Sequence, residues 1–166
     1  MFRFPVNVSP KGFIYSEPFH SNSANDGADF GPDTMLGATT PKDVGSPTSK
    51  TSGIQEAISY AQRNRLVRIR LERGTYLISS RIVIKPDPLY PLSINWNNSV
   101  ILYDGDNAAI EIDYAYADAL FNLSDHLTME RLPFICNLND KRDLERAKAF
   151  AFKQGFEFSI PRRRLR

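Results

Sequence analysis

Two aspartates in the stretch Tyr-Asp-Gly-Asp-Asn are close enough in sequence to do chemistry together. Asp104 and Asp106 flank Gly105. Paired carboxylates can hold Ca²⁺, which prefers oxygen ligands, or act as acid and base on a glycosidic bond. Asp, Gly and Asn are also the residues of a β-turn, in which the side chains bond to the backbone. We expect a turn here, with a Ca²⁺ site as the alternative.

Aromatic and basic side chains nearby could bind a sugar. Trp96, Tyr103 and Tyr114 carry rings of the kind that stack on sugar faces. Arg68 and Arg70 alternate with apolar residues, so both project from one face of a strand and could contact acidic sugars or a neighbouring chain. A solvated strand face is the alternative explanation for these arginines.

The remaining reactive residue types form no recognisable site. His20 and His126 have no partner at metal-ligand spacing, and Cys136 lies in the apolar stretch Leu-Pro-Phe-Ile-Cys-Asn-Leu, which predicts a buried, unreactive thiol. Sequons for N-glycosylation begin at Asn7, Asn97 and Asn122. The sequence therefore predicts no catalytic residue and no cofactor, with Ca²⁺ alone left open.

Length and composition indicate a globular chain with one core. Of 166 residues, 42% are hydrophobic and 24% are charged. The net charge of +2 is small, and no basic run follows one face, which argues against nucleic acid as a partner. No window approaches the ~18 apolar residues of a membrane-spanning helix.

A helix over residues 52–63 would position the strands that follow it. Ser52 and Gln55 have the spacing of a capping box. The apolar residues recur at helical spacing and form one stripe, which consists of Ile54, Ala57, Ile58 and Ala61. We expect this stripe to pack against the strands.

Short β-prone runs separated by turns follow between residues 66 and 123. Such spacing fits an antiparallel sandwich, for which Tyr-Asp-Gly-Asp would be a hairpin, or a solenoid of stacked parallel strands. Residues 1–50 read as a loop-rich arm that lies over the body or pairs with another chain, with a short strand around residues 12–19. Residues 126–166 read as a helix from Asn139 or Asp140 to Gly155, a strand over 156–160 and a basic tail. The chain thus divides at about residues 50 and 125.

Two adjacent segments resemble the N-terminal entry of pectin-lyase-like right-handed parallel β-helices. They are the helix over residues 52–63 and the stretch that follows it, Val-Arg-Ile-Arg-Leu-Glu-Arg-Gly-Thr-Tyr-Leu-Ile-Ser-Ser-Arg-Ile-Val-Ile. In that family a capping helix with an Ile-Gln-x-Ala-Ile pattern is followed by a strand, a Gly-x-Tyr corner and further strands. The match is carried by Ile54, Gln55, Ala57, Ile58, Ala61, Gly74, Tyr76, Ile78, Ile82 and Ile84. The resemblance implies a mainly β fold: a short right-handed parallel β-helix with an N-terminal capping helix and a C-terminal helix and strand that could cover its far end.

The same resemblance bears on function. The family includes polysaccharide lyases, glycoside hydrolases, phage tailspikes and non-catalytic adhesive coils, so it specifies a fold rather than a chemistry. At ~20–25 residues per turn the strand region makes only two or three turns, without the middle turns that hold the family's catalytic residues. We therefore expect a non-catalytic structural or interaction module that forms a homo-oligomer or filament through its arm and coil ends. The alternative is a carbohydrate-active enzyme that is truncated or has its site between subunits. The resemblance also favours an extracellular, cell-surface or virion location over the cytoplasm.

Overall fold

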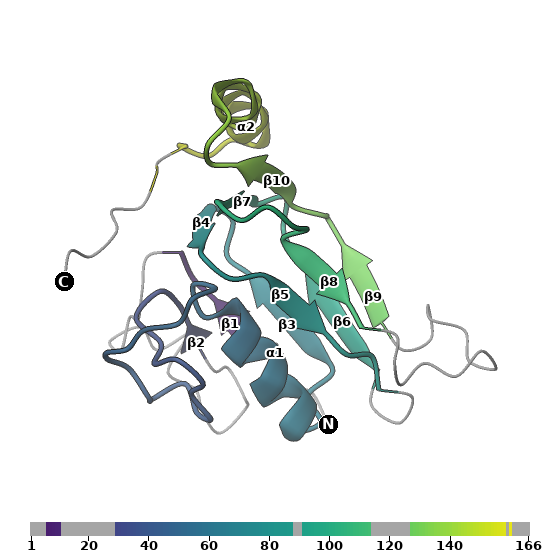
Figure 1. Ribbon diagram of the computed structural model, residues 1–166. Coiled ribbons are helices and arrows are strands. Elements are labelled where there is room, and N and C mark those ends of the chain that lie inside the picture. Colours follow the sequence, from purple (N-terminus) through teal and green to yellow (C-terminus); the bar gives the residue numbers. More distant parts are fainter. Residues whose placement is uncertain (1–5, 11–28, 88–90, 114–126, 159, 161–166) are drawn as a thin grey trace.

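Over the residues that the structure describes, the protein is mainly β, with two helices (Figure 1). The computed structural model describes residues 6–10, 29–87, 91–113, 127–158 and 160. In chain order the elements are β1 (Val6–Val8), β2 (Asp29–Phe30), α1 (Ile54–Arg63), β3 (Arg68–Leu71), β4 (Thr75–Ile78), β5 (Ile82–Ile84), β6 (Leu92–Asn95), β7 (Val100–Tyr103), β8 (Ile110–Ile112), β9 (Leu127–Glu130), β10 (Phe134–Asn137) and α2 (Lys141–Gln154).

The strands form three sheets, and neighbouring strands within each sheet are parallel. The five-stranded sheet has the order β2-β1-β3-β6-β9, the three-stranded sheet has the order β10-β7-β4, and the two-stranded sheet pairs β5 with β8. From β3 to β7 each strand pairs with the one three strands later, so β3, β4 and β5 pair with β6, β7 and β8, and β6 and β7 pair with β9 and β10. The antiparallel sandwich is therefore wrong for the described residues. Asp104 and Asp106 lie in a bend after β7 rather than in a hairpin.

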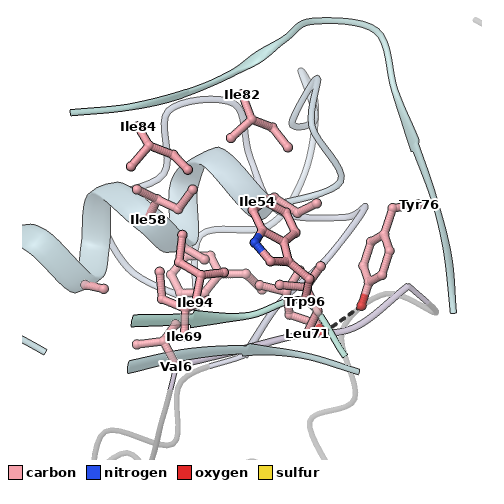
Figure 2. Packing of buried hydrophobic residues seen from close by; sticks show 14 of the residues in the cluster. Val6, Ile54, Ile58, Ile69, Leu71, Tyr76, Ile82, Ile84, Ile94 and Trp96 are labelled. Atoms are coloured by element: carbon pink, nitrogen blue, oxygen red, sulfur yellow. Dashed lines mark hydrogen bonds between the residues drawn. The ribbon is translucent and has the colours of Figure 1, made fainter. Parts of the chain in front are cut away.

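Apolar side chains from all three sheets face one core. Side chains alternate along a strand, so one face of each strand is buried. In the five-stranded sheet Ile69 is in register with Ile94, and both are at most 1% exposed. Figure 2 shows Ile82 and Ile84 of β5 above this row, with Ile54 and Ile58 of α1 between them. The core is thus enclosed by the sheets on its sides and by α1 at one end.

Helix α1 buries the predicted stripe, since Ile54, Ala57, Ile58 and Ala61 are all at most 1% exposed. The prediction of a capping box is wrong. The N-cap is Gly53, and Ser52 instead donates its hydroxyl to the carbonyl of Leu77 at 2.6 Å. The backbone N–H of Gln55 donates to the hydroxyl of Thr51, while the Gln55 side chain bonds the backbone of Val83 instead of capping the helix.

The loop that precedes α1 is bonded to the helix by a buried carboxylate. Glu56 of α1 is 5% exposed. Its Oε1 accepts a hydrogen bond from the Ser49 hydroxyl at 2.6 Å, and its Oε2 accepts one from the Gly37 N–H at 3.1 Å. The Ser49 hydroxyl oxygen also accepts from the N–H of Gly53 at the start of the helix. These bonds make residues 31–50 a folded cover over α1.

The segment over residues 1–50 is more than a loop-rich arm, because it supplies β1 and β2. Val6 and Val8 of β1 are completely buried, and β1 lies between β2 and β3. The hydroxyl of Tyr76 donates to the Val8 carbonyl at 3.0 Å (Figure 2), and burial, followed by the charge of Glu72, raises the pKa of Tyr76 well above its usual range. The strand expected around residues 12–19 lies outside the described residues.

Helix α2 packs on the outer face of the three-stranded sheet (Figure 1). Its predicted ends are confirmed: Asp140 accepts bonds from the N–H groups of Arg142 and Asp143, and Gly155 ends the helix with a φ of 82°. Both Ala147 and Ala151 are buried. Ala147 packs in one cluster with apolar residues that point away from the main core, which are Leu77, Val100, Leu102, Phe134 and Cys136. The described residues of 156–160 form no strand, so that prediction is wrong.

Candidate functional site

The outer face of the five-stranded sheet carries polar side chains in register across neighbouring strands. One row joins Asn7, Arg70, Asn95 and Glu130, and the next joins Arg68, Ser93 and Thr128. These positions face away from the core because they alternate with Ile69, Ile94 and Met129 along the strands. Arg68, Thr128 and Glu130 are exposed, while Arg70, Ser93 and Asn95 are partly buried. The face is rich in hydrogen-bonding groups and suits a polyhydroxyl ligand.

The expected sugar-stacking residues are not on this face. Trp96 is completely buried in the core, and its indole N–H has no hydrogen-bond partner among the described residues. Tyr103 is 7% exposed, and its hydroxyl donates to Oδ1 of Asn107. Tyr114 lies outside the described residues. Stacking of Trp96 or Tyr103 on a sugar is therefore wrong, since neither ring face is accessible, whereas Arg68 and Arg70 do lie on the outer face as expected.

The acidic residues named from the sequence do not come together as a metal site. Asp106 is exposed and Asp104 is partly buried in the bend that follows β7. Within the described residues no three His, Cys, Asp or Glu side chains form a group that could hold a metal ion. Glu111 of β8 points outward and pairs with Arg81, with 3.4 Å between Oε2 and Nη2. None of these groups has the surroundings of an acid and base pair.

Two of the three sequons have asparagines that already serve the fold. Asn7 is 6% exposed within β1. The Asn97 side chain donates to the Leu71 carbonyl at 3.2 Å and accepts from Arg73 at 3.2 Å, and Arg73 also donates to the carbonyl of Gln154 at the end of α2. Asn122 lies outside the described residues. A glycan on Asn7 or Asn97 would require these contacts to open.

Cys136 is buried in the cluster between α2 and the three-stranded sheet, as the sequence predicted. Burial raises the pKa of its thiol to about 11, and the negative charges of Asp143 and Asp140 add to the effect. A thiol with such a pKa stays protonated near neutral pH. Because the thiolate is the nucleophilic form, Cys136 is unsuited to nucleophilic catalysis.

At the α1 end of the sheets, side chains and loop backbone occupy the strand edges. The Gln55 side chain bonds both backbone groups of Val83 in β5: its Oε1 accepts from the N–H at 2.7 Å, and its Nε2 donates to the carbonyl at 3.0 Å. Gln62 donates to the Lys85 carbonyl at 2.8 Å. The Lys50 carbonyl accepts from the N–H of Ser79, just after β4. Each of these groups takes the place that a neighbouring strand would have.

The opposite end of the sheets lacks this protection at two strands. Figure 1 shows β8 and β9 on the side of the molecule away from α1. At β10 the Asp143 carboxylate accepts a bond from the N–H of Asn137 at 3.1 Å. Along β8 and β9, among the described residues, no strand pairs with the outer edge. We call this surface the open end. It consists of the outer edges of β8 and β9 and the apolar side chains next to them.

The core is less well covered at the open end than elsewhere. Ile110 and Ile112 of β8 are only partly buried, whereas their register partners Ile82 and Ile84 are completely buried. Ile135 of β10 is 41% exposed, although it is in register with the buried Ile101. Apolar surface beside strand edges that have no strand partner among the described residues is the kind of surface that can pair with another chain.

Sequence reasoning missed β9 and β10 and the role of Gln55. Strand β9 pairs with β6 and places Met129 in register with Ile94. The sequence spacing alone does not show that these two segments are neighbours. Gln55 was recognised as part of a motif, but its contact with Val83 depends on how α1 lies against β5.

Comparison with known proteins identifies no relative, since no family model, curated protein or solved structure matches the chain. Within the part of the chain that the structure describes, no helix has the length and apolar character needed to cross a membrane.

Proposed function

We propose that this chain is a short right-handed parallel β-helix of the pectin-lyase-like type and that it acts as a non-catalytic structural module, which associates with copies of itself through the open end. Support for the β-helix comes from the succession of strands: β3, β4 and β5 pair in parallel with β6, β7 and β8, and β6 and β7 in turn pair with β9 and β10. A chain that winds repeatedly around one core produces this order.

The observation that carries the functional proposal is the difference between the two ends. At the α1 end Gln55 occupies the edge of β5 and α1 covers the core. At the open end Ile135 is 41% exposed and the outer edge of β9 has no strand partner among the described residues. In globular proteins such an edge is protected or is used for pairing. Pairing with another copy satisfies the backbone groups and removes the apolar surface from water.

The test is the molar mass of the purified chain, measured by sedimentation equilibrium over a wide concentration range. We expect the mass to rise above the 18.8 kDa of one chain as concentration increases. A chain that remains a monomer throughout would refute self-association.

A second candidate, a carbohydrate-active protein, is favoured by the polar outer face of the five-stranded sheet. Arg70, Asn95 and Glu130 lie in one row there and could bond successive sugar hydroxyls. Binding of polygalacturonate should then weaken when Ser93, in the middle of this face, is replaced by Tyr. A Ser79→Tyr variant is the matched control, because Ser79 is exposed and follows β4, which belongs to the three-stranded sheet.

Catalysis is tested separately from binding. Pectate, polygalacturonate and other uronate-rich polymers are assayed with and without Ca²⁺, alongside an Asp104→Asn, Asp106→Asn double variant. We expect no turnover. Cleavage that disappears in the double variant would replace the structural proposal with an enzymatic one.

A further inference from the structure

The outer edge of β9 has no strand partner among the described residues, and its backbone geometry predicts how two copies would pair. In a parallel ladder, residues along a strand direct their N–H and C=O groups alternately to one neighbour and the other. The Glu130 carbonyl accepts from the N–H of Trp96 at 3.0 Å, so Glu130 and Thr128 direct their backbone groups toward β6. Leu127 and Met129 therefore direct theirs outward.

We propose that the chain forms a closed two-fold dimer in which β9 pairs in antiparallel register with β9 of a second copy, with Met129 opposite Met129. This inference rests on the self-association proposed above. Because the backbone groups of Met129 point outward, two copies related by a two-fold axis at this residue can exchange a pair of N–H···O=C bonds. The five-stranded sheets then continue from one copy into the next.

The side chains of β9 are complementary in this register. Thr128 lies opposite Glu130 of the second copy, and both are exposed on the outer face. A hydroxyl donor therefore meets a carboxylate on each side of the axis, and two Glu130 side chains do not face each other. The apolar Leu127 and Met129 side chains lie on the opposite, core-facing side, close to the apolar surface of the open end.

Charge makes the other exposed edge a poorer partner for itself. If β8 paired with its own copy over its full length, Glu111 would lie directly opposite Glu111. Like charges in directly opposed positions destabilise a strand pair. A filament in which all three sheets continue head to tail is also disfavoured. At the α1 end Gln55 and Gln62 bond the backbone along and just after β5, and Lys50 bonds the backbone just after β4, so strands of another copy could not pair there. The two-fold pairing of β9 is the arrangement left.

Disulfide trapping tests the register. In the proposed dimer Thr128 and Glu130 of the second copy form a non-hydrogen-bonded pair with Cα atoms about 4.5 Å apart, within the range of a disulfide. A Thr128→Cys, Glu130→Cys double variant should give a covalent dimer under mild oxidation. Either single variant should not, because the introduced cysteine would then be diagonal to its counterpart in the second copy, at about 7–8 Å. Cys136 remains in place, since it is buried.

A proline substitution tests the backbone pairing without relying on trapping. Met129→Pro removes an N–H that points away from β6, so the fold should persist, while sedimentation should show a monomer at concentrations where the wild-type chain is dimeric. Met129→Leu keeps the N–H and should remain a dimer. If Met129→Pro unfolds, judged by circular dichroism, the trapping result decides.

The outcomes separate this inference from the functional proposal. An oligomer that gives no covalent dimer in the double variant, or equal trapping in a single variant, would overturn the β9 register while self-association stands. A mass that increases without limit would overturn the closed dimer. A monomer at every concentration would refute both.

Discussion

Replacing Gln55 by Met should destabilise the protein measurably, because Gln55 serves as a substitute strand at the edge of β5. The change keeps an unbranched side chain of similar length and removes two hydrogen bonds, of 2.7 Å from the Val83 N–H and 3.0 Å to the Val83 carbonyl. A backbone group left unsatisfied in a buried position costs about 1–3 kcal/mol. Gln55 and Val83 are both partly exposed, so water can replace some of the loss.

We therefore expect the free energy of unfolding to fall by about 2 kcal/mol, the low end of the cost for two such groups. For a chain of this size, that corresponds to a decrease in melting temperature of roughly 4–8 °C. Gln55→Glu should lose less, because a carboxylate still accepts from the Val83 N–H, although it offers the carbonyl no donor.

Equilibrium unfolding in urea measures the effect, with the fluorescence of Trp96 as the probe, since Trp96 is the single tryptophan and is completely buried. Gln62→Met is the matched control: it removes one exposed bond to the Lys85 carbonyl and should cost less than about 0.5 kcal/mol. Equal urea midpoints for Gln55→Met and Gln62→Met would refute the reasoning.

Three other predictions concern α1 and the cluster beneath α2. Ile58→Asp places an unpaired carboxylate in the core, where Ile58 is 1% exposed, and should lower the free energy of unfolding by several kcal/mol or prevent folding, as seen by circular dichroism. Gly53→Ala should destabilise the protein much more than Gly37→Ala, as measured by thermal melts of the two variants. Both glycines have positive φ, but a Cβ on Gly53 would lie 2.5 Å from the Gly31 nitrogen, whereas a Cβ on Gly37 would meet open space. In the folded protein the pKa of Cys136 is about 11, above the ordinary value of 9.0. The stabilisation that comes from its protonated thiol is therefore complete below pH 9 and is lost as the pH rises toward 11. Urea titrations of Cys136→Ala should show a smaller loss of stability at alkaline pH, and a pH profile equal to that of the wild type would contradict this prediction.

The sequence predicted the regular parts of the fold because they have strong periodicity. The apolar stripe from Ile54 to Ala61 and the alternating strands from Arg68 onward follow directly from helical and strand spacing. Strand β1 was missed because three residues carry too little pattern, and its partner β3 is remote in sequence. The pairing order of the strands, which excluded the sandwich, depends on register rather than on composition.

The candidate sites were less predictable, because they depend on which way a side chain points. Trp96 lies next to the end of β6, and no pattern in the sequence states whether it faces the core or solvent. It faces the core. Ser52 has the right spacing for a capping box, but its φ of 55° and its bond to Leu77 are consequences of how the chain enters α1. The C-terminal helix was expected to cover the far end of the strands, but α2 packs on the outer face of the three-stranded sheet instead. The location of the open end at β8 and β9 required the sheet order.

The position of β1 also bears on the order in which the protein folds. Val6 pairs with Ile69, so the chain must close a loop that contains α1 and residues 31–50 before β1 can join the five-stranded sheet. Loop closure of this length costs conformational entropy before any contact repays it. During synthesis β1 emerges well ahead of β3, and until β3 is complete its only partner is the two-residue strand β2. We therefore expect the β3–β6 pair to form first and β1 to dock last, so that until then β3 presents a second exposed edge to any other chain nearby.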